Sequence, residues 1–254
     1  MSYVAATIAT VLYIGAPLEA HVVDFLPPDL VPSPQFVLSP LLGITPVPLP
    51  QNVLPPAGLA PGSQYQLIFR TFSTTAATSD DIDYYNAFVA NEAASGVPYG
   101  LPAGVTWRAI ASTPTVNARD NAPWVGLPVY NTRGELVTAS DLYGGSLLAP
   151  VLYDQLGLPY EVFNAPVWTG SDPFGYRIPG LTLGDPSGQG AIGAQNLTDG
   201  RWLDLYDAGQ PSIAAIYALS SPITFVPEPS SLALVGLALS VLGIVQLLRT
   251  RCRT

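Results

Sequence analysis

Five acidic and aromatic residues in the second half of the chain have the side chains best suited to chemistry. Carboxylates beside exposed rings can bind sugars, because the rings stack on sugar C–H faces and the acids accept hydrogen bonds from hydroxyl groups. Two carboxylates about 5–9.5 Å apart in a cleft could instead hydrolyse a glycosidic bond. In a third interpretation, Trp202 packs in the core and the three aspartates, Asp199, Asp204 and Asp207, are solvated. The residues are Asp199, Trp202, Asp204, Tyr206 and Asp207.

Composition excludes several other classes of site. The chain has one histidine, His21, and one cysteine, Cys252, so it can build no Ser-His-Asp triad, zinc centre or internal disulfide. The net charge is −9, which leaves no basic patch to replace the counterions of a nucleic acid. We therefore expect no metal, no cofactor and no nucleic-acid partner, and we expect a protein that is not an enzyme.

Two smaller groups of charged residues have structural interpretations. Asp80, Asp81 and Asp83 could bind a cation, but they fit better in the first turn of a helix, where the helix dipole favours negative charge. Arg119 and Asp120 could form a site, but they fit better as an ion pair that anchors a turn.

The residues between 62 and 225 are predicted to form the folded domain that positions these side chains. Apolar residues alternate in 64–72, which predicts a strand, and an apolar stripe in 79–96 predicts a helix ending at Gly96. The remainder is rich in turns, and a long loop is expected at 171–200. Together these elements predict an α+β fold with a loop-rich centre. The other predicted elements are strands at 104–112, 165–170 and 212–225, a hairpin at 128–139 and a short helix at 141–151.

Both flanks of this domain differ from it in composition. Residues 1–25 are apolar and predict a signal or leader segment. Residues 26–61 contain eleven prolines, which predicts a polyproline-II linker, part of which could lie on the domain or on a partner. Residues 226–254 form a separate C-terminal segment.

The C-terminal segment has three parts in a fixed order. It begins with Val226, Pro227, Glu228, Pro229 and Ser230, in which the prolines keep the backbone extended. An uncharged apolar run follows at 232–248 and, as a helix, would span about 25 Å, the low end for crossing a bilayer. Basic residues next to such a span favour the cytoplasmic side. They are Arg249, Arg251 and Arg253.

This tripartite segment resembles the PEP-CTERM sorting signal of Gram-negative bacterial exosortase substrates. The resemblance covers about 30 residues and rests on Pro227-Glu228-Pro229, the apolar run and the arginines. It implies an exported protein that an exosortase-like membrane peptidase recognises in the inner membrane, where 232–248 inserts transiently. It further implies cutting near the motif and delivery to the cell envelope, the surface or the extracellular matrix, with exopolysaccharide as a candidate partner.

The domain at 62–225 resembles disulfide-free C-type-lectin-like domains of exported bacterial proteins. The resemblance rests on the order of its landmarks, from the strand QLIFRTF through TSDDIDYYNAF, TWRAIASTPTVNARD and PVYNTRGELV to VWTG and IYALS. It implies a binding role. Calcium-dependent members carry a Trp-Asn-Asp triplet, where this chain has Trp202-Leu203-Asp204, so calcium is not expected.

The sequence thus predicts an exported, surface-destined protein with one α+β domain, a C-terminal transmembrane helix and a structural or binding role. One alternative is a secreted glycan hydrolase that uses two of Asp199, Asp204 and Asp207. Another is a single-pass protein that stays anchored through 232–248.

Overall fold

The structure, a computed structural model, describes residues 52–160 and 162–226. The chain divides into two compact units, Met1–Pro48 and Leu49–Thr254, and every described residue belongs to the second.

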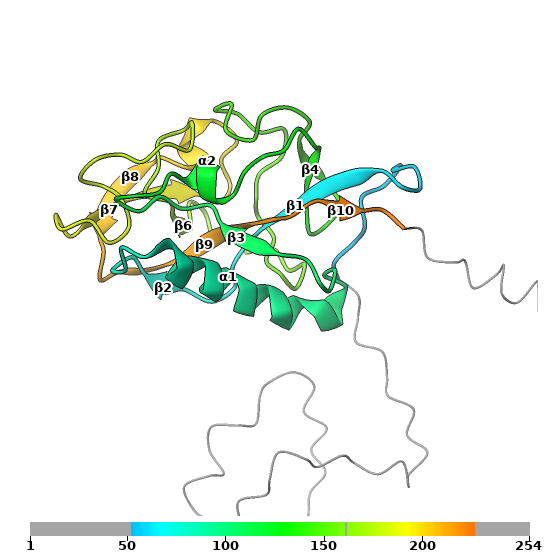
Figure 1. The fold of residues 1–254 in the computed structure, drawn as a ribbon, viewed down its shortest axis with the longest axis horizontal. Coiled ribbons are helices and arrows are strands. Elements are labelled where there is room, and N and C mark those ends of the chain that lie inside the picture. Colours follow the sequence, from blue (N-terminus) through cyan, green and yellow to red (C-terminus); the bar gives the residue numbers. More distant parts are fainter. Residues whose placement is uncertain (1–51, 161, 227–254) are drawn as a thin grey trace, which may run out of the picture. The chain divides into compact units, whose positions relative to one another are not determined.

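The described part consists mostly of β structure (Figure 1). Its strands are β1 (Gln64–Arg70), β2 (Thr75–Ala76), β3 (Trp107–Ala109), β4 (Val129–Asn131), β5 (Leu136–Thr138), β6 (Pro166–Trp168), β7 (Gln189–Ala194), β8 (Tyr206–Gly209), β9 (Ile213–Ser220) and β10 (Ile223–Thr224). Its helices are α1 (Ile82–Gly96), the 3-10 helix η3 (Val97–Tyr99), α2 (Ala118–Asn121) and the 3-10 helix η4 (Gly200–Trp202).

One mixed sheet organises the described residues. Its main path runs β5-β4-β1-β9-β6-β7-β8, while β10 pairs with β1, and both β2 and β3 pair with β9. The central pair β1–β9 is antiparallel, with Phe69 opposite Ala218. The β1–β4 and β6–β9 pairs are parallel. The strands at either end of the domain's sequence are therefore neighbours at the centre of its sheet.

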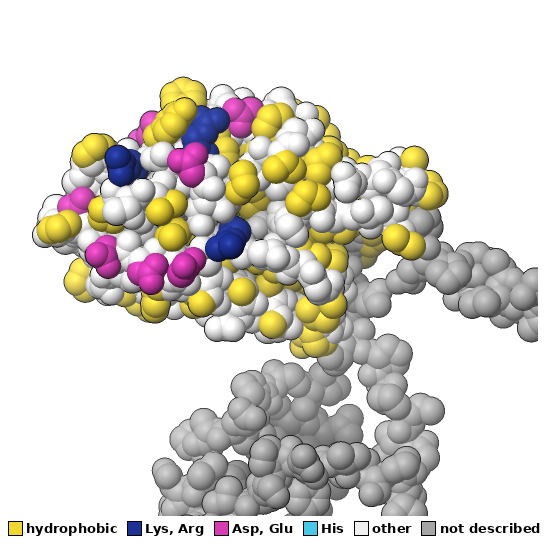
Figure 2. Space-filling model, viewed as in Figure 1, with side chains coloured by type: hydrophobic (Ala, Val, Ile, Leu, Met, Phe, Trp, Pro, Cys, Tyr) yellow, Lys and Arg dark blue, Asp and Glu magenta, His cyan; other side chains and the backbone are white. Residues whose placement is uncertain are grey.

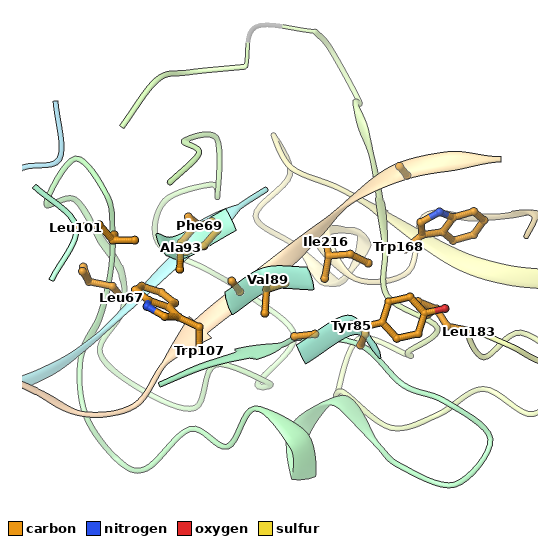
Figure 3. Packing of buried hydrophobic residues seen from close by; sticks show 14 of the residues in the cluster. Leu67, Phe69, Tyr85, Val89, Ala93, Leu101, Trp107, Trp168, Leu183 and Ile216 are labelled. Atoms are coloured by element: carbon orange, nitrogen blue, oxygen red, sulfur yellow. The ribbon is translucent and has the colours of Figure 1, made fainter. Parts of the chain in front are cut away.

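The two central strands, β1 and β9, are buried on both faces of the sheet. Successive side chains of each strand point to opposite faces, so the core consists of two clusters, one on each face. Tyr65, Leu67 and Phe69 of β1 belong to the cluster that α1 covers. Figure 3 shows this cluster, including Tyr85 and Val89 from α1. Because α1 supplies a continuous apolar stripe, it buries one face of the sheet by hydrophobic packing.

The opposite face is covered by loops and short helices instead of a long helix. Ile68 of β1 and Tyr217 of β9 point into this second cluster, together with Tyr143 and Trp202 from the covering segments. The Trp202 and Tyr217 ring centroids lie 5.3 Å apart. The fully buried hydroxyl of Tyr143 donates a hydrogen bond of 2.7 Å to the Ala122 carbonyl, which fixes α2 against this layer.

The prediction of an α+β, C-type-lectin-like domain is wrong, because the described residues form mostly β sheet with one long helix. The segment 141–151 does not form the predicted helix. It runs as turns, and Leu147 and Leu148 donate backbone hydrogen bonds to Thr198 and Val137. The segment 171–200, predicted as a loop, contains the whole of β7, which pairs with β8 beyond the end of the segment.

Strand β7 escaped prediction because glycine weakens the strand pattern in its sequence, QGAIGA. Close packing requires those glycines. A Cβ atom on Gly190 would lie 2.9 Å from the Trp168 ring, and one on Gly193 would lie 1.9 Å from the carbonyl oxygen of Trp202. The strand therefore forms through tertiary contacts that local sequence does not reveal.

The predicted helix at 79–96 is confirmed, with a later start. It begins at Ile82, and its N-cap is Asp81, whose carboxylate accepts a hydrogen bond of 2.9 Å from the amide of Asp83. Ser79 lies before the N-cap. Its backbone amide and carbonyl both bond the hydroxyl of Tyr85.

The chain already packs on the domain upstream of the predicted boundary at 62. Val53 is buried, and its amide donates a hydrogen bond of 3.1 Å to the Tyr99 carbonyl. The amide of Leu54 donates one of 2.9 Å to the Thr132 carbonyl. The last part of the proline-rich segment therefore packs on the domain.

Three predicted segments lie outside the described residues: the leader at 1–25, most of the proline-rich segment and the sorting signal from Pro227 onward. Within the described residues, no helix is both long and apolar enough for a membrane span. The span predicted at 232–248 lies outside them.

Candidate functional site

Asp199 is engaged in local structure at the start of η4. Its carboxylate accepts a hydrogen bond from the amide of Arg201 and forms an ion pair with the Arg201 guanidinium, in which Nη2 lies 2.7 Å from Oδ2. Hydrogen bonding to Arg201 lowers the pKa of Asp199 below its usual value. A carboxyl group held ionised in this way is a poor proton donor, which weakens its case as a catalytic acid.

Trp202 lies in the core and is fully buried. It packs against Tyr217 in the cluster on the loop-covered face of the sheet. A ring in this position has no free face for a sugar, so the predicted binding platform does not include it.

Asp204, Tyr206 and Asp207 follow Trp202 on the way into β8. Tyr206 and Asp207 are exposed, and Asp204 is half-buried. Burial raises the pKa of Asp204, and the carboxylates of Asp172 and Asp207 raise it further. The structure thus brings Asp204 near another acid, Asp172, that the sequence did not suggest.

The remaining charged candidates have structural partners. Asp83 lies in the first turn of α1 and pairs with Arg108, with Nη1 and Oδ1 3.6 Å apart. Arg119 pairs with Asp141 at 3.6 Å instead of its neighbour Asp120. Asp120 accepts a hydrogen bond of 2.7 Å from the side chain of Asn117. Across residues 52–160 and 162–226, no three His, Cys, Asp or Glu side chains are grouped to hold a metal ion.

A groove of about 500 Å³ with a mixed, mainly apolar lining lies along α2 and the ends of β3 and β9. Arg108, Asp120 and Asn121 supply polar groups to its lining, and Val125 and Pro222 supply apolar ones. Asn121 is held in place because its amide nitrogen donates hydrogen bonds to the Asn86 side chain and to a backbone carbonyl of β3.

The loop 171–177, here called the Phe174 loop, is the feature that the sequence prediction missed. It carries two exposed rings, Phe174 and Tyr176. The sequence Asp172-Pro173-Phe174-Gly175 is a turn signature, since aspartate bonds the backbone two residues on and glycine accepts a positive φ. That signature indicated a tight turn. It did not show that both rings would be exposed.

The chain leaves the described domain beside the start of β1. β10 pairs with β1, placing Gln64 opposite Thr224, and Phe225 is bonded to Gly62 and Ser63 through backbone hydrogen bonds of 2.9 and 2.8 Å. The next residue, Val226, is 75% exposed. The sheet is therefore complete one residue before Val226, the first residue of the predicted sorting motif.

A second hollow, of about 530 Å³, lies at this exit. Its lining combines the first described residues with the last, including Val53, Leu54, Phe225 and Val226. Neither this hollow nor the groove along α2 is lined by Asp199, Asp204 or Asp207.

Comparison of the sequence with protein-family models and with curated proteins gives no match to either.

Proposed function

We propose that this chain is an exported, non-enzymatic protein that an exosortase-like membrane peptidase sorts to the cell envelope or surface. The order of Pro227-Glu228-Pro229, the apolar run 232–248 and the following arginines supports the proposal. A peptidase at the bilayer edge needs an extended backbone, and two prolines around Glu228 disfavour a helix there.

The observation that carries this proposal is the position at which the fold closes. The β1–β10 ladder and the hydrogen bonds of Phe225 precede the motif, and Val226 is already exposed. Cleavage near the motif would therefore break no backbone hydrogen bond of the sheet. A domain that closes directly before its processing site can be released intact.

The non-enzymatic role is supported by the placement of the acidic residues. A glycosidase of the predicted kind needs two carboxylates across a cleft, one of them able to donate a proton. Asp199 is ion-paired at the surface, and the two hollows described above contain none of the three predicted acids. A structural or binding component of the extracellular matrix fits this arrangement better than a hydrolase.

The test is replacement of Pro227-Glu228-Pro229 by three alanines in a Gram-negative host that expresses an exosortase-like peptidase. We expect the variant to accumulate in the inner membrane at its uncut mass, whereas the wild type reaches the envelope or the medium. The matched control is Pro46→Ala with Pro48→Ala, which removes two prolines outside the motif. If the triple-alanine variant is localised and processed like the wild type, the sorting proposal fails.

A further inference from the structure

The Phe174 loop carries two exposed aromatic rings on a backbone that is held in place by hydrogen bonds. The Asp172 carboxylate accepts hydrogen bonds of 2.9 Å from the amides of both Phe174 and Tyr176, and Ser171 and Arg177 close the loop as a β-bridge. Gly175 packs directly on the ring of Tyr143, which a Cβ atom would approach within 2.4 Å. The loop backbone therefore loses little further freedom when a ligand binds.

Both rings remain available to solvent despite this support. Phe174 is 52% exposed and Tyr176 is 48% exposed. Hydrogen bonds within the loop fix its backbone and leave these side chains uncovered. Apolar rings held in water carry a free-energy cost that contact with a partner would remove.

Hydrogen-bonding groups of both kinds surround the rings. The Arg119 guanidinium carbon lies 4.7 Å from the centre of the Tyr176 ring, and its nitrogen atoms face Asp141 and the carbonyl of Phe174. On another side, Pro173 packs on Gly200, between Asp199 and Arg201 of the ion pair. Guanidinium donors and carboxylate acceptors thus both lie beside the loop that carries the rings. Figure 2 shows basic, acidic and apolar side chains mixed on the face of the molecule that it draws.

We propose that the Phe174 loop and the neighbouring groove along α2 bind a neutral polysaccharide. A sugar ring has an apolar C–H face for stacking and hydroxyl groups that both donate and accept, which matches rings surrounded by both kinds of group. The arginines at 119 and 201 are each paired with an acid, and the whole chain carries a net charge of −9, so a polyanion would be repelled.

Helix α2 connects the loop to the groove. Arg119 lies against the Phe174 loop, while its neighbours Asp120 and Asn121 line the groove. A polysaccharide stacked on Tyr176 can therefore continue across α2 toward Arg108. The site accordingly favours long chains over single sugars. Its biological setting rests on the proposed export, but the sorting signal plays no part in binding by purified protein, so the two proposals can fail separately.

The experiment is affinity electrophoresis of the full-length chain in a detergent with a non-sugar head group. The gels contain hydroxyethylcellulose, xyloglucan, galactomannan or dextran as neutral probes and alginate as the anionic one. We expect at least one neutral polymer to retard the wild type and alginate not to. The double variant F174A/Y176A should bind about tenfold more weakly, because two stacking contacts are lost.

The matched control is Phe72→Ala, which removes a similarly exposed phenylalanine, 58% accessible, two residues after the end of β1. It should bind like the wild type. Oligosaccharides of increasing length, cut from the retained polymer, should compete with increasing strength. The proposal is overturned if no neutral polymer retards the wild type, if the double variant binds like the wild type, or if alginate alone binds. Loss of self-association without any loss of sugar binding would instead assign the rings to a contact between copies of the chain.

Discussion

The backbone amide of Gly62 donates a hydrogen bond of 2.9 Å to the carbonyl oxygen of Phe225, which joins the beginning of the central sheet to its end. The amide of Phe225 donates a second bond, of 2.8 Å, to Ser63. This ladder ends at Phe225, two residues before Pro227, and the intervening residue, Val226, is exposed. Cleavage beyond Val226 would therefore leave this ladder intact, and a domain cut there would keep these hydrogen bonds.

The first prediction concerns truncation at this junction. A chain that ends at Val226 should unfold at the same urea concentration as the domain in the full-length protein. A chain that ends at Ser221 loses buried Ile223 and the β1–β10 pairing, and should be less stable by about 3 kcal/mol. Tryptophan fluorescence during urea unfolding measures both. Equal midpoints for the two truncations would show that β10 does not close the fold.

The second prediction concerns Gly193, one of the glycines that weaken the strand pattern in the sequence of β7. Gly193→Ala should destabilise the protein by about 3 kcal/mol or more, because its Cβ would lie 1.9 Å from a backbone oxygen. Gly209→Ala, in the paired strand β8, is the matched control, since its Cβ would meet only Pro211, at 3.9 Å. Thermal unfolding followed by circular dichroism compares the two. Equal losses would mean that β7 does not pack on the η4 backbone as described.

The third prediction tests which of two aromatic residues near β8, Trp202 and Tyr206, is part of the core and which lies at the surface. Trp202→Ala should cost about 3–5 kcal/mol of unfolding free energy, because it empties a fully buried site. Tyr206→Ala changes an exposed residue and should cost no more than about 0.5 kcal/mol. Chemical denaturation of both variants checks this. A Trp202 variant as stable as the Tyr206 variant would contradict its placement in the core.

The fourth prediction concerns pH. Burial raises the pKa of Asp204 in the folded state above its ordinary value of 3.8, so the folded protein binds this proton more tightly than the unfolded chain does. The contribution to stability is then lost as the pH rises from 3.8 through the folded pKa. Asp204→Asn should therefore raise stability at pH 7 and flatten its fall across that window.

Urea unfolding between pH 3 and pH 8 tests this fourth prediction. Asp207→Asn serves for comparison: it removes only the smallest of the three contributions that raise the pKa of Asp204 and leaves the burial of Asp204 in place, so it should change the profile less. An Asp204 variant that is less stable than the wild type at pH 7 would show that the ionised carboxylate is stabilising, contrary to the prediction.

Regular patterns allowed part of the fold to be predicted. Alternation in β1, the apolar stripe of α1 and the hairpin at Gly134, between β4 and β5, were all evident from the sequence. Strand β7 was missed because Gly190 and Gly193 are dictated by distant contacts with Trp168 and Trp202. The fold class was wrong for this reason, since unrecognised strands made the domain look richer in loops and helices than it is.

The candidate site was less predictable than the fold. The acids near Trp202 were identified as a group, but sequence cannot tell whether a tryptophan lies in the core or at the surface, and Trp202 lies in the core. The exposed rings of Phe174 and Tyr176 depend on the Asx-type turn at Asp172 and on packing against Tyr143. The turn is local, but the packing of Gly175 on Tyr143 joins segments that are far apart in the sequence.

Sorting by an exosortase-like peptidase is the central claim, and the intact mass of the mature protein tests it most directly. Protein recovered from the envelope or the medium of an expressing Gram-negative host should end close to Pro227-Glu228-Pro229 and lack Arg249, Arg251 and Arg253. A mature protein whose mass still includes the arginine tail would contradict the claim and would support permanent anchoring through residues 232–248.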